Sequence, residues 1–190
     1  MSIDIIIADD HAILRSGIRK VLEFEDDFTV VAEATNGLEA IEKTLELEPD
    51  ILLLDINMPI KNGFETVTEL VNKKIDTKII ILTINNDENY VLEMLKNGAS
   101  GYLLKDIEPS MLIKAIRKIH QGENYIYPEI ARQIFGDVDF SGDMAKTAEL
   151  ILKKRRRKKK TAREHDVLQC ICKEMKNQEI AKELKKKKKT

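Results

Sequence analysis

Five short runs of Ile, Leu and Val, spaced at regular intervals, constrain the fold of this chain more than any other feature. Each run is followed by a segment whose apolar residues recur every three or four positions, the spacing of an amphipathic helix. Nearly continuous apolar strands indicate a sheet covered on both faces. The predicted strands are residues 3–8, 28–34, 50–55, 78–83 and 101–105. The pattern therefore predicts an α/β fold, a doubly wound five-stranded parallel sheet.

The pattern changes after Gly122, so we expect three parts in the 190 residues. Residues 1–121 form the α/β domain, 122–152 a helical linker, and 153–190 a small all-α segment. In the linker, a helix should begin near Pro128 and run to about Phe135, since proline favours the first helical position.

Charge divides the chain in the same way. Residues 1–150 carry 15 Lys and Arg against 28 Asp and Glu, whereas residues 151–190 carry 17 against 5. The block KKRRRKKK at 153–160 should stay disordered, because its cations repel one another. Nucleic acid is the obvious partner for the basic part, although charge alone does not separate this from a solvated basic linker.

Two sequence features bear on location. No apolar run reaches the length needed to span a bilayer, and the N-terminus lacks the pattern of a signal peptide. We therefore expect a cytoplasmic protein without a membrane partner. Cys170 and Cys172 do not complete a metal site, so we interpret them as reduced packing residues.

Charged and polar side chains follow four of the five predicted strands. Asp9 and Asp10 end the first, Asp55 the third, Thr83 the fourth and Lys105 the fifth. In a parallel sheet these ends meet at one edge, where ligands bind. Adjacent carboxylates repel each other unless a cation lies near them, and Mg²⁺ binds carboxylates while leaving room for phosphate oxygens. The sequence thus predicts a site for Mg²⁺ and a phosphoryl group.

Each of these residues also has a structural explanation. Asp10 could cap the first helix, Asp55 could be a loop acid, and Thr83 an ordinary strand residue. Lys105 could be a surface lysine. Their coincidence at the ends of four strands favours a shared site.

The motifs around these residues resemble a known family. Asp9-Asp10, DINMP with Asp55, LT with Thr83, and GYLLK with Lys105 resemble the signature of bacterial response-regulator receiver domains over residues 1–121. NGASGYLLKD and the segment after it are similar to the NarL/FixJ subfamily. TAREHDVLQCICKEMKNQEIAKEL resembles the first half of the LuxR-type helix-turn-helix domain. The resemblance implies a flavodoxin-like receiver followed by a partial DNA-binding domain.

The resemblance also implies a role for each acid. Asp55 would accept a phosphoryl group from the phosphohistidine of a sensor histidine kinase. Asp10 and Asp55 would bind Mg²⁺ directly, together with the backbone carbonyl of Asn57, and Asp9 would act through water. The protein would therefore be a phosphoryl acceptor with Mg²⁺-dependent self-phosphorylation and dephosphorylation chemistry, not a turnover enzyme.

Three further residues would respond to the phosphoryl group. Lys105 would balance its charge and Thr83 would donate a hydrogen bond to it. Tyr102 would turn inward as Thr83 moves, unless it is an ordinary strand tyrosine. Phosphorylation would then repack one face of the domain and could allow a homodimer.

In the C-terminal part, the chain stops at Thr190, where the recognition helix of the resembled domain should begin. Residues 153–190 would thus lack that helix, which enters the major groove. Lys176, Asn177 and Lys182 are the candidates for weak DNA contacts. Promoter DNA is expected as a partner of the longer parent protein.

Two other functions remain open at this stage. The receiver could act by phosphorylation-dependent protein contact without binding DNA. A metal-dependent phosphohydrolase of similar topology is disfavoured, because such enzymes place a second Asp two residues after the nucleophile and this chain has Asn57 there.

Overall fold

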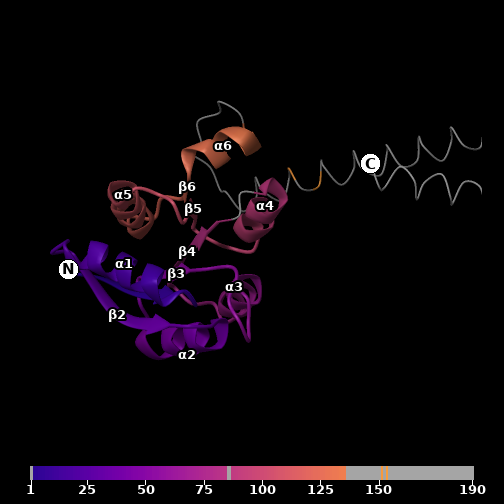
Figure 1. The fold of residues 1–190 in the computed structure, drawn as a ribbon. Helices are drawn as coiled ribbons and strands as arrows, with labels where there is room; N and C mark the ends of the chain where they lie inside the picture. Colours follow the sequence, from indigo (N-terminus) through magenta and orange to yellow (C-terminus); the bar gives the residue numbers. More distant parts are fainter. Residues whose placement is uncertain (1, 85–86, 136–150, 152, 154–190) are drawn as a thin grey trace, which may run out of the picture. The chain divides into compact units, whose positions relative to one another are not determined.

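The computed structural model describes residues 2–84, 87–135, 151 and 153, and its centre is a six-stranded parallel sheet of order β2-β1-β3-β4-β5-β6 (Figure 1). The chain divides into two compact units, residues 1–149 and 150–190, and the sheet belongs to the first. The strands are β1 (Ile3–Ala8), β2 (Phe28–Ala34), β3 (Ile51–Leu54), β4 (Lys78–Thr83), β5 (Gly101–Leu104) and β6 (Tyr125–Ile126). The predicted doubly wound parallel sheet is confirmed, and its five strands are extended by a sixth.

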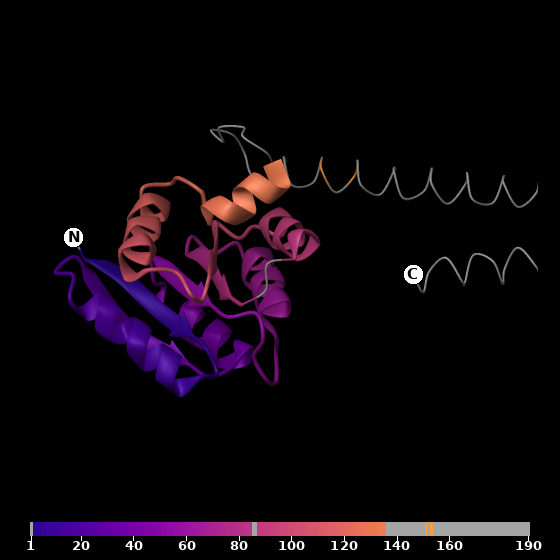
Figure 2. The ribbon, with the colours of Figure 1, turned by 45° about the horizontal axis from the view of Figure 1, so that its top comes forward.

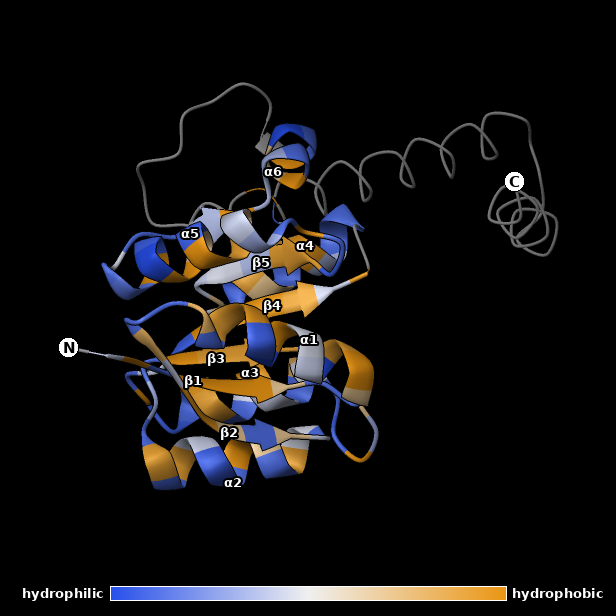
Figure 3. Ribbon diagram, turned by 60° about the vertical axis from the view of Figure 1, so that its left-hand side comes forward, coloured by the Kyte–Doolittle hydropathy of each residue, from blue (hydrophilic) through white to orange (hydrophobic). Residues whose placement is uncertain are grey.

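Helices cover both faces of the sheet, as the apolar strands require. They are α1 (Ala12–Glu23), α2 (Gly37–Leu47), α3 (Gly63–Asn72), α4 (Glu88–Lys96), α5 (Pro109–His120) and α6 (Pro128–Phe135). Buried residues of α1 and α5 pack on one face against Ile5, Leu53 and Leu103. Figure 3 shows that β1, β3 and β4 are mainly apolar, whereas the helices around them mix apolar and polar residues. Among the described residues, no helix combines the length and apolar content needed to cross a bilayer.

Side chains fix the starts of three helices on the edge that carries the strand ends. Asn36 accepts from the backbone of Glu39 at the start of α2, and Asn62 forms a capping box with Glu65 at the start of α3. Asp87 accepts from two backbone N–H groups of α4. These bonds satisfy N–H groups that a helix leaves unpaired. The loops around the strand ends are therefore anchored.

The start of α1 is different. Its N-cap position is occupied by His11, whose side chain makes no capping hydrogen bond. Asp10, which the sequence allowed as a cap, precedes that position. The structural explanation of Asp10 is therefore wrong, and its carboxylate is left for another use.

The sixth strand lies in the segment predicted as a helical linker. Tyr125 and Ile126 pair with Gly101 and Tyr102 of β5. The helix predicted from Pro128 to Phe135 is confirmed as α6, which lies beside α4 (Figure 2). The predicted DNA-contact residues Lys176, Asn177 and Lys182, and both cysteines, lie outside the described residues.

Candidate functional site

The predicted site residues lie at one edge of the sheet, because β1, β3, β4 and β5 are neighbours in it. Asp9 follows β1, Asp55 follows β3 and Lys105 follows β5, while Thr83 is the last residue of β4. Because the strands are parallel, each one ends at the same edge of the sheet before the chain turns into the next helix. Residues that lie far apart in the sequence thereby come together.

Lys105 joins two of the acids. Its Nζ lies 2.8 Å from Asp9 Oδ2 and 2.8 Å from Asp55 Oδ2. The ammonium side chain is 10% exposed and each carboxylate only 2%. Burial disfavours the charged lysine, but the hydrogen bonds to Asp55 and Asp9 outweigh it, so the pKa of Lys105 is raised above its ordinary value. The lysine is therefore a fixed positive charge between the two acids.

Backbone hydrogen bonds hold the acids in place. The N–H of Asp55 donates to the carbonyl of Ala8 (2.8 Å), and the N–H of His11 donates to Asp9 Oδ1 (2.8 Å). Arg15 Nη1 donates to the backbone carbonyl of Asp9 (2.8 Å). These bonds orient Asp9 and Asp55 before any ligand binds, which lowers the cost of binding.

The loop after Asp55 is shaped by Gly63. Its N–H donates to the carbonyl of Ile56 (2.8 Å), and a Cβ there would lie 2.5 Å from the backbone oxygen of Asp55. Only glycine allows the start of α3 to approach so closely. Gly63 thus allows α3 to begin close to the backbone of Asp55.

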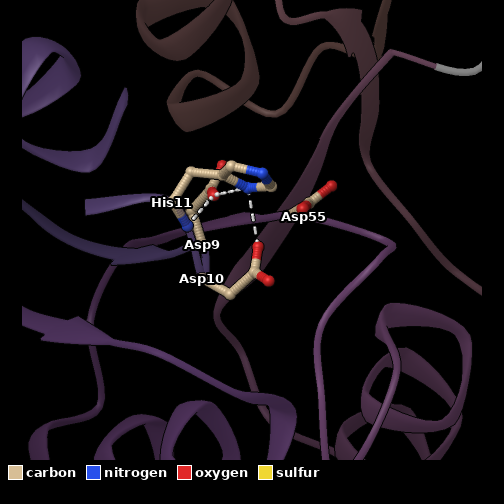
Figure 4. Close-up of side chains that lie close together, drawn as sticks. All are labelled: Asp9, Asp10, His11 and Asp55. Atoms are coloured by element: carbon tan, nitrogen blue, oxygen red, sulfur yellow. Dashed lines mark hydrogen bonds and ion pairs between the residues drawn. The ribbon is translucent and has the colours of Figure 1, made fainter. Parts of the chain in front are cut away.

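A candidate metal centre is formed by Asp9, Asp10, His11 and Asp55 (Figure 4). Their ligand atoms all lie within 4.8 Å of one another. Three carboxylates and the Lys105 ammonium leave a net charge of about −2 when His11 is neutral. A divalent cation would neutralise this charge, so the donor set fits such an ion.

The two adjacent acids occupy different environments. The Asp9 carboxylate is buried and bonded to Lys105, whereas the Asp10 carboxylate is 34% exposed and lies 2.7 Å from His11 Nδ1. Asp10 therefore has greater access to an incoming hydrated ion. Asn57 lies in the exposed loop after Asp55 and lines the same cavity as Asp55 and Lys105.

Thr83 and Tyr102 are linked to the site through the backbone. The N–H of Lys105 donates to the carbonyl of Thr83 (2.9 Å), and the Thr83 side chain is fully buried. Tyr102 lies in β5 three residues before Lys105 and is also fully buried, and its burial raises the pKa of its phenol. The aromatic side chain is thus inward in this structure.

A cavity of about 680 Å³ opens beside the acids, between α1 and α5. Asp55, Asn57 and Lys105 line its polar end, and the rest of its lining is mainly apolar. Ile13 at its rim is 90% exposed and Ile84 is 79% exposed. Two exposed apolar residues therefore line the cavity whose polar end holds the charged site.

Sequence reasoning missed two residues of this site. His11 contacts both Asp9 and Asp10, and Arg15 bonds the Asp9 backbone while pairing with Glu33. The signal for His11 was available, since the histidine directly follows the acid pair. The signal for Arg15 was not, because its contact depends on the turn that starts α1.

Comparison with known proteins identifies the chain's relatives. Residues 5–117 match the family described as the response regulator receiver domain. The transcriptional regulatory protein DegU of Brevibacillus brevis is 42% identical over 132 residues, which cover 70% of this chain and 56% of that protein. The oxygen regulatory protein NreC of Staphylococcus carnosus is 38% identical over 185 residues, covering 95% of this chain and 82% of NreC.

A solved structure agrees with these sequence matches. The crystal structure of a LuxR-family two-component response regulator from an Aurantimonas species superimposes with a TM-score of 0.68 at 33% identity. The match covers 70% of this chain and 96% of that one. The likeness therefore covers nearly the whole of that chain and most of this one.

Proposed function

This chain belongs to the response regulator receiver family, within its NarL/FixJ branch, and on that premise we propose that it accepts a phosphoryl group on Asp55 and thereby controls transcription. The donor is the phosphohistidine of a sensor histidine kinase in the cytoplasm. The observation that carries the proposal is the pairing of the buried Asp55 carboxylate with Lys105 beside the Asp9–Asp10 pair.

The reaction needs little from the protein beyond position and charge. An Asp55 oxygen attacks the phosphorus, the P–N bond to the kinase histidine breaks, and an acyl phosphate forms. Lys105 lies where it balances the added negative charge, because its Nζ already contacts Asp55. The same residues support self-phosphorylation from small phosphodonors and later loss of the phosphoryl group.

We assign the cation to Mg²⁺. Asp10, Asp55 and the backbone carbonyl of Asn57 would hold it directly, and Asp9 through water. The greater exposure of Asp10 than of Asp9 supports this division. When bound, Mg²⁺ supplies positive charge next to the phosphoryl oxygens.

Phosphorylation would be sensed by Thr83 and Tyr102. A hydrogen bond from the Thr83 hydroxyl to the phosphoryl group would move the end of β4. The carbonyl of Thr83 accepts a hydrogen bond from the N–H of Lys105, the residue after β5, so the two strand ends would move together. Tyr102 would then repack in the space that Thr83 leaves. The affected face comprises α4, β5 and α5, and it could pair with a second copy of the chain.

The kinase would dock over the cavity between α1 and α5. Ile13 and Ile84 flank the entrance to Asp55, and their exposure offers apolar contact area to a partner helix. Contact at this place would bring a phosphohistidine to Asp55 without entry of bulk water.

Transcriptional control would be exerted by the C-terminal part. The basic residues 151–190 fit a DNA-binding role, and DegU and NreC are named as regulatory proteins. We propose residues 1–121 as the receiver, 122–152 as the linker and 153–190 as the helix-turn-helix segment. Lys176, Asn177 and Lys182 would then contact DNA.

The experiment is incorporation of phosphate into the purified chain. Incubation with Mg²⁺ and acetyl phosphate should add one phosphoryl group, about 80 Da by mass. Asp55→Ala should add none, while Asp26→Asn, which changes an exposed acid between α1 and β2, should behave as wild type. Incorporation by Asp55→Ala equal to that of wild type would refute the assignment.

DNA binding through charge alone can be distinguished from the sequence-selective binding that transcriptional control requires. Binding by residues 151–190 through charge alone weakens steeply as salt rises. Gel-shift titrations of the phosphorylated parent protein, with its recognition helix, should show selectivity for a promoter fragment over random DNA of equal length. Equal affinity for both would favour the receiver acting through protein contact.

A further inference from the structure

We propose that His11 contributes a nitrogen ligand to the cation site, so that the site binds Mn²⁺ and later first-row ions such as Ni²⁺ more tightly than Mg²⁺. The inference rests on the proposed function, because it concerns the same cation site, and it adds a ligand and a metal preference to it. His11 is the one histidine within the candidate centre formed by the described residues.

The geometry places the imidazole among the acids. His11 Nδ1 lies 2.7 Å from Asp10 Oδ1 and 3.3 Å from Asp9 Oδ1. Figure 4 shows the ring of His11 in contact with both carboxylates. Two ligands on opposite sides of an octahedral ion stand about 4.2 Å apart at bond lengths near 2.1 Å. The ligand atoms of the cluster all lie within 4.8 Å of one another. Small side-chain rotations would therefore bring His11, Asp10 and Asp55 onto one ion, with Asp9 joined to it through water.

The backbone of His11 is already fixed for this role. Its N–H donates to Asp9 Oδ1 (2.8 Å), so the backbone of His11 is held next to the acids of the cation site. The ring is not used to cap α1. Its side chain is 68% exposed, which leaves it able to rotate and lets an ion reach it from water.

Without an ion, the ring must present Nδ1–H to the two carboxylates, because two lone-pair acceptors facing Nδ1 would repel it. A bound cation replaces this hydrogen between the ring and the acids. The proton then resides on Nε2, and the Nδ1 lone pair points at the metal. The contacts seen here thus place Nδ1 within reach of two carboxylate oxygens, where it could share an ion with them.

The chemistry of the ligands sets the preference. Mg²⁺ binds oxygen and gains little from an imidazole. Imidazole suits Ni²⁺, Cu²⁺ and Zn²⁺, and affinities for a nitrogen-containing site rise from Mn²⁺ toward Cu²⁺. Removing the imidazole should therefore weaken Ni²⁺ binding most, Mn²⁺ binding less and Mg²⁺ binding least.

Calorimetric titration of the full chain with Mg²⁺, Mn²⁺ and Ni²⁺ measures this order. We expect His11→Ala to weaken Ni²⁺ binding about tenfold or more, and Mg²⁺ binding by less than about threefold. His120→Ala is the matched control, because it removes a half-exposed histidine at the end of α5, near Asp50 and away from the strand ends. Equal losses for all three ions in His11→Ala would overturn the proposal.

Pulsed electron paramagnetic resonance of the Mn²⁺-loaded chain detects a nitrogen ligand of the ion directly. Wild type and His120→Ala should show the ¹⁴N coupling of a bound imidazole, and His11→Ala should lose it. Absence of the coupling in wild type, or its persistence in His11→Ala, would overturn the proposal. If either result is found while Asp55 still accepts phosphate, the role of His11 is overturned but the proposed function remains. Failure of every divalent ion to bind, with no phosphate gained, would instead remove the proposed function.

Discussion

The backbone N–H of Tyr127 donates to the carbonyl of Tyr102 over 2.9 Å, so the segment after α5 is bonded to the strand that carries the proposed switch residue. Tyr102 also pairs with Ile126 across β5 and β6. Any displacement of β5 on phosphorylation would therefore be passed to β6 and to α6, which contacts α4. The sixth strand makes the linker part of the sheet.

Gly101→Ala should weaken this connection. A Cβ at Gly101 would lie 2.5 Å from Ile119 Cδ1 and 3.2 Å from the carbonyl oxygen of Tyr125. We expect a loss of about 1–3 kcal/mol in the free energy of unfolding, with faster hydrogen exchange at the Tyr127 amide. Urea unfolding and exchange mass spectrometry measure both.

Gly17→Ala is the control for that variant. Gly17 lies inside α1, and no atom lies within 4 Å of the position that a Cβ would take there. Alanine should therefore stabilise the helix by about 0.5–1 kcal/mol. Equal unfolding free energies for Gly101→Ala and Gly17→Ala would show that β6 is not tightly packed against β5.

Lys105→Met should destabilise the metal-free protein and make it more dependent on Mg²⁺. The substitution leaves the buried Asp9 and Asp55 carboxylates without their cation, which costs about 3 kcal/mol. Mg²⁺ should then raise the melting temperature more than in wild type, because the site carries one more negative charge. Thermal melts with and without Mg²⁺ measure this.

Lys96→Met serves for comparison, since Lys96 is a half-exposed lysine of α4 whose nearest acid, Glu93, is 3.9 Å away. It should leave the melting temperature and the Mg²⁺ effect nearly unchanged. An equal response of the two variants would mean that the Lys105 ion pairs add nothing to stability.

The sequence was sufficient to predict the strands and the acid site, because both rest on strong patterns. Long Ile and Leu runs can only be buried, and the parallel order then carries Asp9, Asp55 and Lys105 to one edge. The two residues of β6 carry no periodicity, so the pairing of Tyr125 with Gly101 depends on the path of the chain after α5. That path is set by tertiary contacts.

The different environments of Asp9 and Asp10 did not follow from the residues themselves, although the family resemblance implied different roles for the two. As neighbours they look equivalent, but the end of β1 turns one toward Lys105 and leaves the other beside His11. The start of α1 at Ala12, rather than at Asp10, decides this division. Helix starts are the least certain part of any sequence-based assignment.

Stability should depend on Glu33 at acid pH. Hydrogen bonds from Arg19 and Arg15 lower the pKa of the Glu33 carboxyl below its ordinary value of 4.5. A group with a lowered folded-state pKa stabilises the protein above the unfolded value, and this contribution is lost as pH falls below 4.5 through the folded value. We expect Glu33→Gln to lose about 1 kcal/mol at about pH 7 and little at about pH 3.

Urea unfolding at both pH values gives this difference. Glu46→Gln, on the exposed side of α2, should change stability little at either pH. A loss in Glu33→Gln that is the same at the acid pH as at neutral pH would indicate a packing effect in place of the charge.

The turn after Asp55 contains a strained residue whose replacement should stabilise the protein. Ile60 has φ of 68°, and the N–H of Lys61 donates to the carbonyl of Pro59 (2.7 Å) across it. A β-branched residue in this left-handed region costs free energy, and Ile60 is 79% exposed, so little packing is lost on its removal. Ile60→Gly should therefore raise the free energy of unfolding by about 1 kcal/mol.

Ile84→Gly provides the comparison, because Ile84 is equally exposed at 79% but has no positive φ. Glycine there adds only unfolded-state entropy and should destabilise the protein by about 0.5–1 kcal/mol. Opposite signs for the two variants in urea unfolding would show that the backbone of Ile60 is strained. Destabilisation by Ile60→Gly would mean instead that the side chain contributes contacts that outweigh the strain, and that the turn after Asp55 is held by packing.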